Sequence, residues 1–327
     1  MKNRRAALCA IAALPLALAR AGGSGAQQNG KRFLVGLLDA SDRTDWWTAF
    51  RQQLNDLGYV EGRNISYEMR LAKGELDLLP GMARELVRLK PNVIATSGTA
   101  AAIAAKKATS TIPIVMTTGT DQVSLGLAAT LSHPGGNVTG LSTLTSELMG
   151  KRFELIREFF PNLKRLAVLW HNENVSSMAS VRDLEGVTAK AKVALQTVGV
   201  AGPEDLAAAF LTMAQQRAEA VIVVQTPLMY TERKVITDLA LKNKLPSMYG
   251  AAEYVVDGGL MSYAPSYPEL FRHAAIYVQK ILGGANPGDL PIEQPSTFEF
   301  VINKRTAQAL GIVVAKSMLA RATRVVE

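Results

Sequence analysis

The stretch Asn92-Val93-Ile94-Ala95-Thr96-Ser97-Gly98-Thr99 decides the fold class, together with the later Ile112-Pro113-Ile114-Val115-Met116-Thr117-Thr118-Gly119-Thr120-Asp121. Each stretch is a short apolar run that ends in hydroxyl side chains and a glycine. The alanine-rich segment 100–107, which follows the first run, favours a helix. Buried parallel strands that turn directly into helices have this pattern. The two stretches therefore predict an α/β protein.

The ends of these two runs are also the first candidates for a binding site. In parallel sheets a ligand sits beyond the carboxyl ends of the strands, where the N–H groups of helix starts are unpaired. Ser97, Thr99 and Thr118 are placed to hold a small carboxylate there, and Gly98 and Gly119 belong to the same turns. The alternative is that the hydroxyls only cap helices. Two successive segments of one design favour a site.

The N-terminus has the features of a secretory signal. A basic start is followed by an uncharged apolar run over residues 6–19, which is short for a membrane span. We expect a signal peptide over residues 1–26 and a periplasmic mature protein. Cleavage could follow Ala19 or Ala26, and the small, polar stretch 21–30 favours Ala26. An uncleaved anchor is the alternative.

Composition narrows the function classes. The 327 residues are enough for two domains, and 48% hydrophobic and 20% charged residues are typical of a globular protein. Cys9 is the single cysteine and lies in the predicted signal, so the mature chain has no thiolate for a metal or a disulfide. The net charge of +8 falls to +4 without the four basic residues of 1–26. Since the remaining basic residues are scattered, nucleic-acid binding is not expected.

Strand and helix patterns alternate along the rest of the chain, which predicts parallel sheets. The strand patterns are too many for one sheet of usual size, so two α/β lobes that separate near Gly140 are expected. The last strands must return to a lobe already begun. The expected strands are 33–38, 64–71, 92–97, 112–118, 138–143, 166–170, 194–200, 220–224, 246–249, 259–263 and 297–302. The expected helices are 44–57, 75–89, 100–107, 147–160, 176–192, 204–217, 231–242 and 268–282.

Five motifs in order carry a resemblance to a known family. They are Gly58-Tyr59-Val60-Glu61-Gly62-Arg63-Asn64, Ala108-Thr109-Ser110-Thr111-Ile112-Pro113-Ile114-Val115, His133-Pro134-Gly135-Gly136-Asn137-Val138-Thr139-Gly140-Leu141-Ser142, Gly258-Gly259-Leu260-Met261-Ser262-Tyr263 and Asp289-Leu290-Pro291-Ile292-Glu293-Gln294-Pro295. The chain resembles ABC-transporter substrate-binding proteins of the type I periplasmic binding class, in the branch that includes binders of aromatic amino acids.

The resemblance implies two Rossmann-like lobes with parallel sheets, joined by three crossover strands. It implies lobe one from 32–140 plus 258–290 and lobe two from 141–257 plus 291–327. It also implies that the lobes close around a ligand and that the closed form meets a membrane permease. Gln122, His171, Thr226, Ala252 and Ala264 stand where the family usually has Pro, Asn, Asp, Arg and Gly. Three of these lie at expected cleft positions, which allows a different ligand.

Further candidate ligand contacts follow from the strand ends. Ser41 is a weaker candidate from lobe one, and an ammonium group would need an acid, for which Asp121, Asp42 and Glu253 are available. The lobe-two candidates are Ser142, His171, Asn174 and Thr226, with Tyr249 and Tyr263 as an aromatic wall. Each has a simpler alternative: Asp121 in its own turn, His171 as an exposed or hydrogen-bonding side chain rather than a metal ligand, and the tyrosines in the core.

The function predicted from these features is ligand capture for transport. The chain has no G-x-x-x-x-G-K-[ST], G-x-S-x-G or H-E-x-x-H motif, so an enzyme is not expected. We expect a monomer without cofactor or metal, whose partners are a small-molecule ligand (an amino acid or related small carboxylate) and an ABC permease. Two alternatives stay open: a ligand-sensing periplasmic protein that signals to a membrane receptor, and, more distantly, an exported hydrolase.

Overall fold

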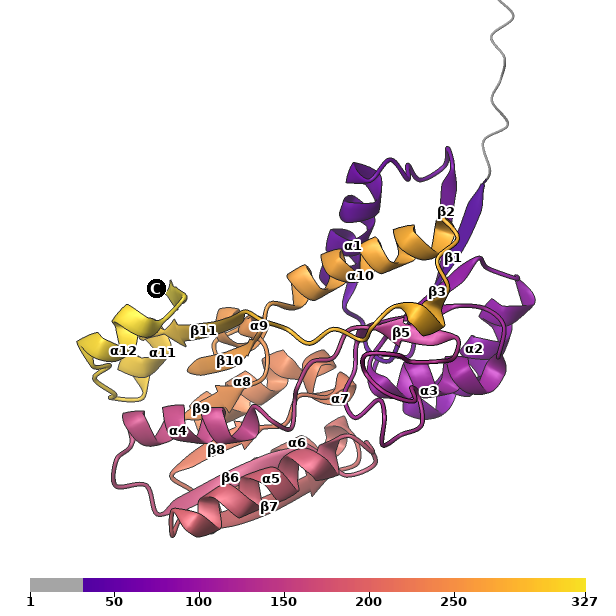
Figure 1. The fold of residues 1–327 in the computed structure, drawn as a ribbon. Coiled ribbons are helices and arrows are strands. Elements are labelled where there is room, and N and C mark those ends of the chain that lie inside the picture. Colours follow the sequence, from indigo (N-terminus) through magenta and orange to yellow (C-terminus); the bar gives the residue numbers. More distant parts are fainter. Residues whose placement is uncertain (1–31) are drawn as a thin grey trace, which may run out of the picture. The chain divides into compact units, whose positions relative to one another are not determined.

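Two β-sheets organise residues 32–327, the part of the chain that the computed structural model describes (Figure 1). These residues form one compact unit. The predicted signal peptide over 1–26 lies outside them. Within 32–327, no helix has both the length and the apolar character needed to cross a membrane.

The first sheet has five parallel strands in the order β2-β1-β3-β4-β5. They are β1 (Phe33–Asp39), β2 (Ile65–Leu71), β3 (Val93–Ser97), β4 (Ile114–Thr118) and β5 (Val138–Gly140). The two stretches that decided the fold class form β3 and β4, and all residues of both strands are buried. Parallel strands buried on both faces need apolar side chains at almost every position, which is what these runs supply.

Helices cover both faces of the first sheet. They are α1 (Thr44–Asp56), α2 (Leu79–Arg88) after the short η1 (Leu76–Leu78), α3 (Thr99–Ala108) and α10 (Tyr267–Leu282). Alternate residues of a strand point to opposite faces: Leu37 belongs to the cluster with α1 and α10, whereas Leu38 packs with α2 and α3. Figure 1 shows α10 running beside α1, although most of lobe two separates them in sequence.

The second sheet has seven strands in the order β12-β11-β10-β9-β8-β6-β7. They are β6 (Arg165–His171), β7 (Ala194–Val200), β8 (Ala220–Val223), β9 (Ser247–Tyr249), β10 (Met261–Pro265), β11 (Phe298–Asn303) and β12 (Arg324–Val326). All neighbours are parallel except β10 and β11, which are antiparallel. Two parallel-sheet lobes were predicted, and this arrangement confirms them with one antiparallel pair added.

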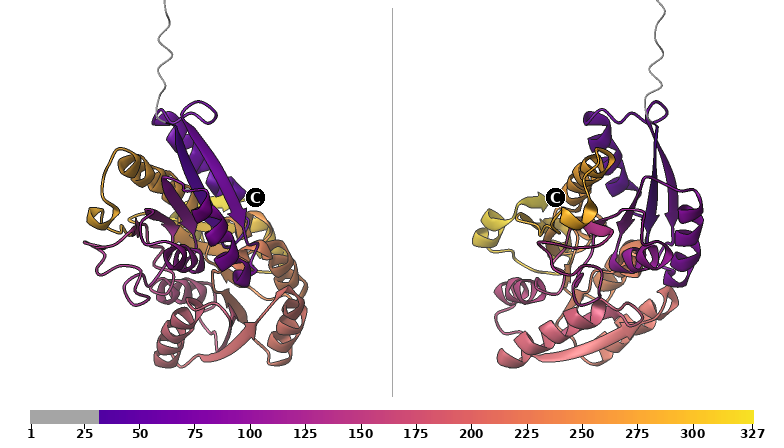
Figure 2. Two further views of the ribbon diagram at one scale, coloured as in Figure 1. Left: turned by 90° about the vertical axis from the view of Figure 1, so that its right-hand side faces the viewer. Right: turned by 45° about the vertical axis from the view of Figure 1, so that its right-hand side comes forward.

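Helices cover both faces of the second sheet as well (Figure 2). Its helices are α4 (Met149–Phe159), α5 (Ser177–Lys190), α6 (Leu206–Gln215), α7 (Pro227–Thr231), α8 (Arg233–Lys242), α9 (Ala252–Val256), α11 (Lys304–Ala309) and α12 (Lys316–Arg321), with short η2 (Pro203–Asp205). The short elements α7, α9, α11, α12 and β12 were not expected, because segments this brief carry too little periodicity to be recognised.

The chain passes between the lobes three times, and one crossing differs from the expectation. Residues 258–290 were predicted to belong to lobe one. Strand β10 instead pairs with β9 and β11 in the second sheet, and the chain crosses between Pro265 and Tyr267. The glycine pair at 258–259 suggested an earlier crossing, but it serves the tight turn after α9, where Gly259 N–H donates to the Tyr254 carbonyl. The other crossings follow β5 and η3 (Pro287–Asp289), and a bridge between Leu141 and Glu293 joins them.

One apolar cluster extends through both lobes. It contains Leu37 and Trp47 beside the first sheet and Leu169 and Val223 of the second. Helix α10, with Phe271 at its centre, belongs to the same cluster. The side chains between the two sheets are therefore continuous with both cores, and this is the region in which the strand ends of the two lobes face each other.

Candidate functional site

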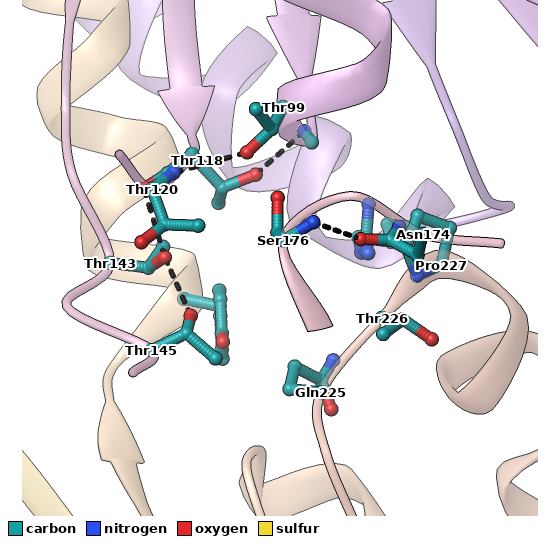
Figure 3. Close-up of a pocket in the computed structure, with 14 residues that line it drawn as sticks. Thr99, Thr118, Thr120, Thr143, Thr145, Asn174, Ser176, Gln225, Thr226 and Pro227 are labelled. Atoms are coloured by element: carbon teal, nitrogen blue, oxygen red, sulfur yellow. Dashed lines mark hydrogen bonds between the residues drawn. The ribbon is translucent and has the colours of Figure 1, made fainter. Parts of the chain in front are cut away.

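A cavity lies where the carboxyl ends of the parallel strands of both sheets meet. Its wall comes from the turns after β1, β3 and β4, from the turns after β6 and β8, and from two crossing segments. The lining residues are Arg43, Gly98, Thr99, Thr118, Gly119, Thr120, Thr143, Thr145, Asn174, Ser176, Gln225, Thr226, Pro227 and Tyr267. Figure 3 shows Thr99, Thr118 and Thr120 facing Ser176 and Gln225 across it. Ligands of open α/β sheets bind at this edge.

Most of the lining is hydroxyl and amide, and the cavity is small. Six threonines and one serine line it, together with Asn174 and Gln225. Its volume is about 50 Å³, whereas one buried water needs roughly 10–15 Å³ measured in this way. The lining therefore suits a compact polar molecule that offers several hydrogen-bonding atoms.

On the lobe-one side, the hydroxyls are held by the backbone. Thr118 Oγ1 accepts from Gly98 N–H at 2.9 Å, and Thr99 Oγ1 accepts from Thr120 N–H at 3.1 Å. Gly98 has φ +91°, a conformation that favours glycine. The turn at Gly98 starts helix α3, so the first N–H groups of α3 lie at the wall of the cavity.

On the lobe-two side, two turns end in helix starts. Asn174 Oδ1 accepts from Ser176 N–H at 3.0 Å just before α5. The Thr226 hydroxyl accepts from Met229 N–H at 3.3 Å and caps α7. Ser176 Oγ and both amide atoms of Gln225 are buried, and within residues 32–327 they have no hydrogen-bond partner. These groups remain free to bond a molecule in the cavity.

A charged cluster supports the first turn. Arg43 lines the cavity with 5% of its surface exposed, and its Nη1 donates to Asp39 Oδ1 at 3.0 Å and to Ser97 Oγ at 2.9 Å. Trp47 Nε1 donates to the other Asp39 oxygen at 2.8 Å. Asp39 therefore neutralises Arg43 and fixes its direction.

Six of the fourteen predicted ligand contacts lie in the cavity wall: Gly98, Thr99, Thr118, Gly119, Asn174 and Thr226. Two more lie just behind it. Ser97 accepts from Arg43, and Ser41 donates to Asp39 through its N–H at 2.8 Å and its hydroxyl at 3.1 Å. These two side chains shape the site through Arg43 and Asp39.

The other predicted contacts lie outside the lining. Ser142 N–H pairs with the Glu293 carbonyl at a crossing, and Asp42 accepts from Thr231 of the other lobe at 3.3 Å. Tyr249 is fully buried and stacks on Tyr254 at 4.6 Å, while Tyr263 stacks on Phe298 at 5.7 Å. Tyr249 ends β9 but packs into the apolar core there, and Tyr263 lies in the middle of β10 and packs against the core of lobe two.

His171 and Asp121 also lie outside the lining. His171 is the last residue of β6, 2% exposed, and burial lowers the pKa of its imidazole. Asp121 has φ +54°, and its pKa is raised by burial first and then by the Glu147 and Asp183 carboxylates. The turn alternative for Asp121 fits this backbone, since Asp tolerates the left-handed region.

Several lining residues were missed. Thr143 and Thr145 lie on the first crossing, Gln225 follows β8, and Tyr267 begins α10. Gln225 directly precedes the Thr226-Pro227 helix start, so the same strand-end rule that selected Thr226 was available to find it. The crossing residues carry no local signal, since their place depends on the packing of both lobes.

The lobes also touch beside the cavity. Trp46 Nε1 of α1 donates to Glu253 Oε1 of α9 at 2.6 Å, and Trp46 stacks on Tyr267 at 4.3 Å. Helix α7 packs against two glycines of lobe one: a Cβ on Gly74 would lie 3.3 Å from Leu228 Cα, and one on Gly98 would lie 3.8 Å from Pro227 Cγ. The absence of side chains at Gly74 and Gly98 lets lobe two approach the turns that form the site.

Glu253 gives a pH-dependent prediction. Burial is the main cause that raises the pKa of its carboxyl, so the folded protein holds this proton more firmly than the unfolded chain does. The charged form therefore costs stability at neutral pH, and this cost disappears as the pH falls below the unfolded pKa of about 4.3. Glu253→Gln removes the charge and keeps an acceptor for Trp46. We expect a higher Tm at pH 7.5, by about 2–4 °C for each kcal/mol regained, and no gain at pH 4.

Calorimetric Tm values over pH 4–8 measure this effect. Glu154→Gln is the matched control, because this carboxylate is exposed and pairs with Lys151 on the surface. A lower Tm for Glu253→Gln than for the parent at pH 7.5 would contradict the prediction.

Comparison with known proteins adds to this geometry. Residues 39–326 match the model of a protein family described as ABC transporter substrate binding protein. A curated relative, the tyrosine-binding protein of Clostridioides difficile (strain R20291), is 28% identical over 263 residues, which are 80% of this chain and 75% of that protein.

Two solved structures share the arrangement of both lobes. A conserved domain protein from Vibrio cholerae superposes with a TM-score of 0.85 at 30% identity, covering 90% of this chain and all of that one. An ABC domain from Streptococcus pneumonia in complex with L-Trp gives a TM-score of 0.83 at 25% identity with the same coverage.

Proposed function

Because the chain belongs to the family of ABC transporter substrate binding proteins, we propose that it captures a small carboxylate ligand, such as an amino acid, between its lobes. It then delivers this ligand to the permease of an ABC transporter. Two of the similar proteins, one named a tyrosine-binding protein and one solved in complex with L-Trp, favour this ligand class. We further propose that the protein is exported after signal cleavage, acts as a monomer without cofactor and does not turn its ligand over.

One observation carries the proposal: the cavity is lined from both lobes, with unpaired polar groups on the lobe-two side. A ligand that contacts both lobes stabilises their closed arrangement, because it gains contacts only when they meet. A permease that recognises the closed arrangement then distinguishes the loaded protein from the empty one.

Calorimetric titration with amino acids and small carboxylic acids tests the proposal. We expect one bound molecule per chain, recovered unchanged by NMR, and a smaller radius of gyration by X-ray scattering when the ligand is present. Chemical conversion of the bound molecule would instead point to an enzyme. Binding without any change in radius would contradict the closure step.

The hydroxyl of Ser176 gives a specific binding prediction. It is buried at the start of α5, lines the cavity and has no partner among residues 32–327. Ser176→Ala should weaken ligand binding by about 1–2 kcal/mol, the value of one lost hydrogen bond. The measurement is calorimetric Kd with the ligand found above.

Ser180→Ala is the matched control for this prediction. Ser180 lies on the same helix with an equally buried hydroxyl that lacks a partner in the described residues, but it does not line the cavity. Its loss should leave Kd unchanged. Equal effects of the two substitutions would show that Ser176 acts through the helix rather than through the ligand.

A further inference from the structure

Arg152 is a buried cation without a carboxylate partner. It lies on α4 with 1% of its surface exposed, and no Asp or Glu among residues 32–327 comes within ion-pair distance of it. Its Nε donates to the Tyr263 carbonyl at 2.9 Å, and its Nη1 lies 3.5 Å from the Thr145 carbonyl and 3.4 Å from Met149 Sδ. A buried charge without a partner is costly, so a protein that retains one needs a reason.

The guanidinium stands directly behind the wall of the cavity. Thr145, whose carbonyl faces Nη1, lines the cavity. Arg152 and Gln225 are close neighbours beside Gly250: a Cβ built on this glycine would lie 3.1 Å from Arg152 Nη2 and 2.7 Å from Gln225 Cβ. Gln225 also lines the cavity, and its amide has no partner within the described chain. One positive charge therefore lies a single side chain away from the ligand.

Other features of the wall add positive potential. Arg43 is neutralised by Asp39, so it contributes direction rather than net charge. Helices α3 and α5, of 10 and 14 residues, both begin at the wall. The N-terminal ends of such helices carry partial positive charge. The charges of Arg43 and Asp39 cancel, so Arg152 leaves the wall and the residues directly behind it with a net charge of about +1. The partial charges of the helix ends add to this.

A counter-charge for an ammonium group is missing. Within residues 32–327, no Asp or Glu side chain lines the cavity. Of the three acids proposed from sequence for this role, Asp42 accepts from Thr231, Glu253 accepts from Trp46, and Asp121 lies outside the lining. A bound amino acid would leave its ammonium group buried without a carboxylate, which is unfavourable.

We propose that the ligand is a small organic acid that has a carboxylate but no amino group, bound with its carboxylate toward Gln225 and Arg152. This inference rests on the proposed function and narrows its ligand class. The ligand's negative charge compensates Arg152, and the free amide of Gln225 supplies a direct hydrogen bond. The small cavity volume adds a preference for short acids.

Matched pairs of compounds test this inference on the parent protein. The acids are propionate, 4-methylpentanoate, 3-phenylpropionate and succinate, and the partners are L-alanine, L-leucine, L-phenylalanine and L-aspartate. Ethylamine and 2-phenylethylamine are the cation controls. We expect at least one acid to bind at least about tenfold more tightly than its amino-acid partner, and no binding by the amines.

The outcomes separate the two proposals. If every amino acid that binds does so at least as tightly as its acid, the inference is overturned and the proposed function stands. If neither acids nor amino acids bind, both are overturned.

Variants of Arg152 test the source of the preference. Arg152→Met should weaken acid binding at least about tenfold, whereas Arg152→Lys, which keeps the charge, should recover most of it. Arg157→Met on the same helix is the matched control and should bind as the parent does. Parent-like acid binding by Arg152→Met would overturn the inference. If Arg152→Met does not fold, the comparison of Arg152→Lys with the parent over the same pairs decides.

Discussion

Replacing Gly140 by alanine is expected to destabilise the protein by at least about 3 kcal/mol, the combined cost of backbone strain and overpacking. Gly140 ends β5 with φ +125°, a conformation that side chains rarely allow. A Cβ there would lie 2.5 Å from Met116 N and 2.9 Å from Met116 C, and nearer still to the Met116 carbonyl oxygen. Since these are backbone atoms of the paired strand β4, no rotamer change relieves the overlap.

Gly136→Ala is the matched control for this prediction. Gly136 lies in the connection just before β5, and nothing approaches the position of its Cβ within 4 Å. Chemical denaturation of both variants gives the two free energies of unfolding. Similar values for Gly140→Ala and Gly136→Ala would mean that β4 and β5 shift apart at little cost.

Asp39→Asn should lower the free energy of unfolding by about 3–5 kcal/mol, as expected when one member of a buried ion pair is removed. The Asp39 carboxylate is fully buried and accepts from Arg43, from Trp47 and twice from Ser41. An asparagine turns one of its two acceptor oxygens into a donor. The change also leaves the Arg43 guanidinium buried without its counter-charge.

A double variant identifies the cause. Asp39→Asn combined with Arg43→Met removes both charges, so part of the lost stability should return. Asp56→Asn at the exposed end of α1 should have little effect, since Asp56 only accepts from Gln52 on the surface. If the double variant is as unstable as the sum of the two single variants, the ion pair is not the cause of the loss.

The fold was largely predictable because its signals are local. Val93 to Ser97 and Ile114 to Thr118 are uninterrupted apolar runs that stop at hydroxyls, and burial on both faces of a parallel sheet requires such runs. The placement of β10 was not predictable, because Gly258 and Gly259 mark a turn without saying which sheet the next strand joins. Its pairing with β9 and β11 depends on contacts distant in sequence.

The residues of the candidate site also differ in whether a local sequence signal predicts them. Thr99, Thr118 and Thr226 follow strands directly, and strand ends can be read from sequence. Arg152 could not be found in this way, because it reads as one more charged residue on an amphipathic helix. Its burial arises from packing against β10 and the first crossing segment, which no local pattern records.

Helix α10 has a consequence for the order in which the protein folds during synthesis. It packs on α1 and on the first sheet, yet it lies after nearly all of lobe two in the chain. Trp47 and Phe50 of α1 therefore lack a covering surface until residues 267–282 have left the ribosome. Lobe one can complete its core only after most of lobe two has been synthesised. The growing chain therefore completes no lobe early, and it stays unfolded for longer than a protein with two sequential domains.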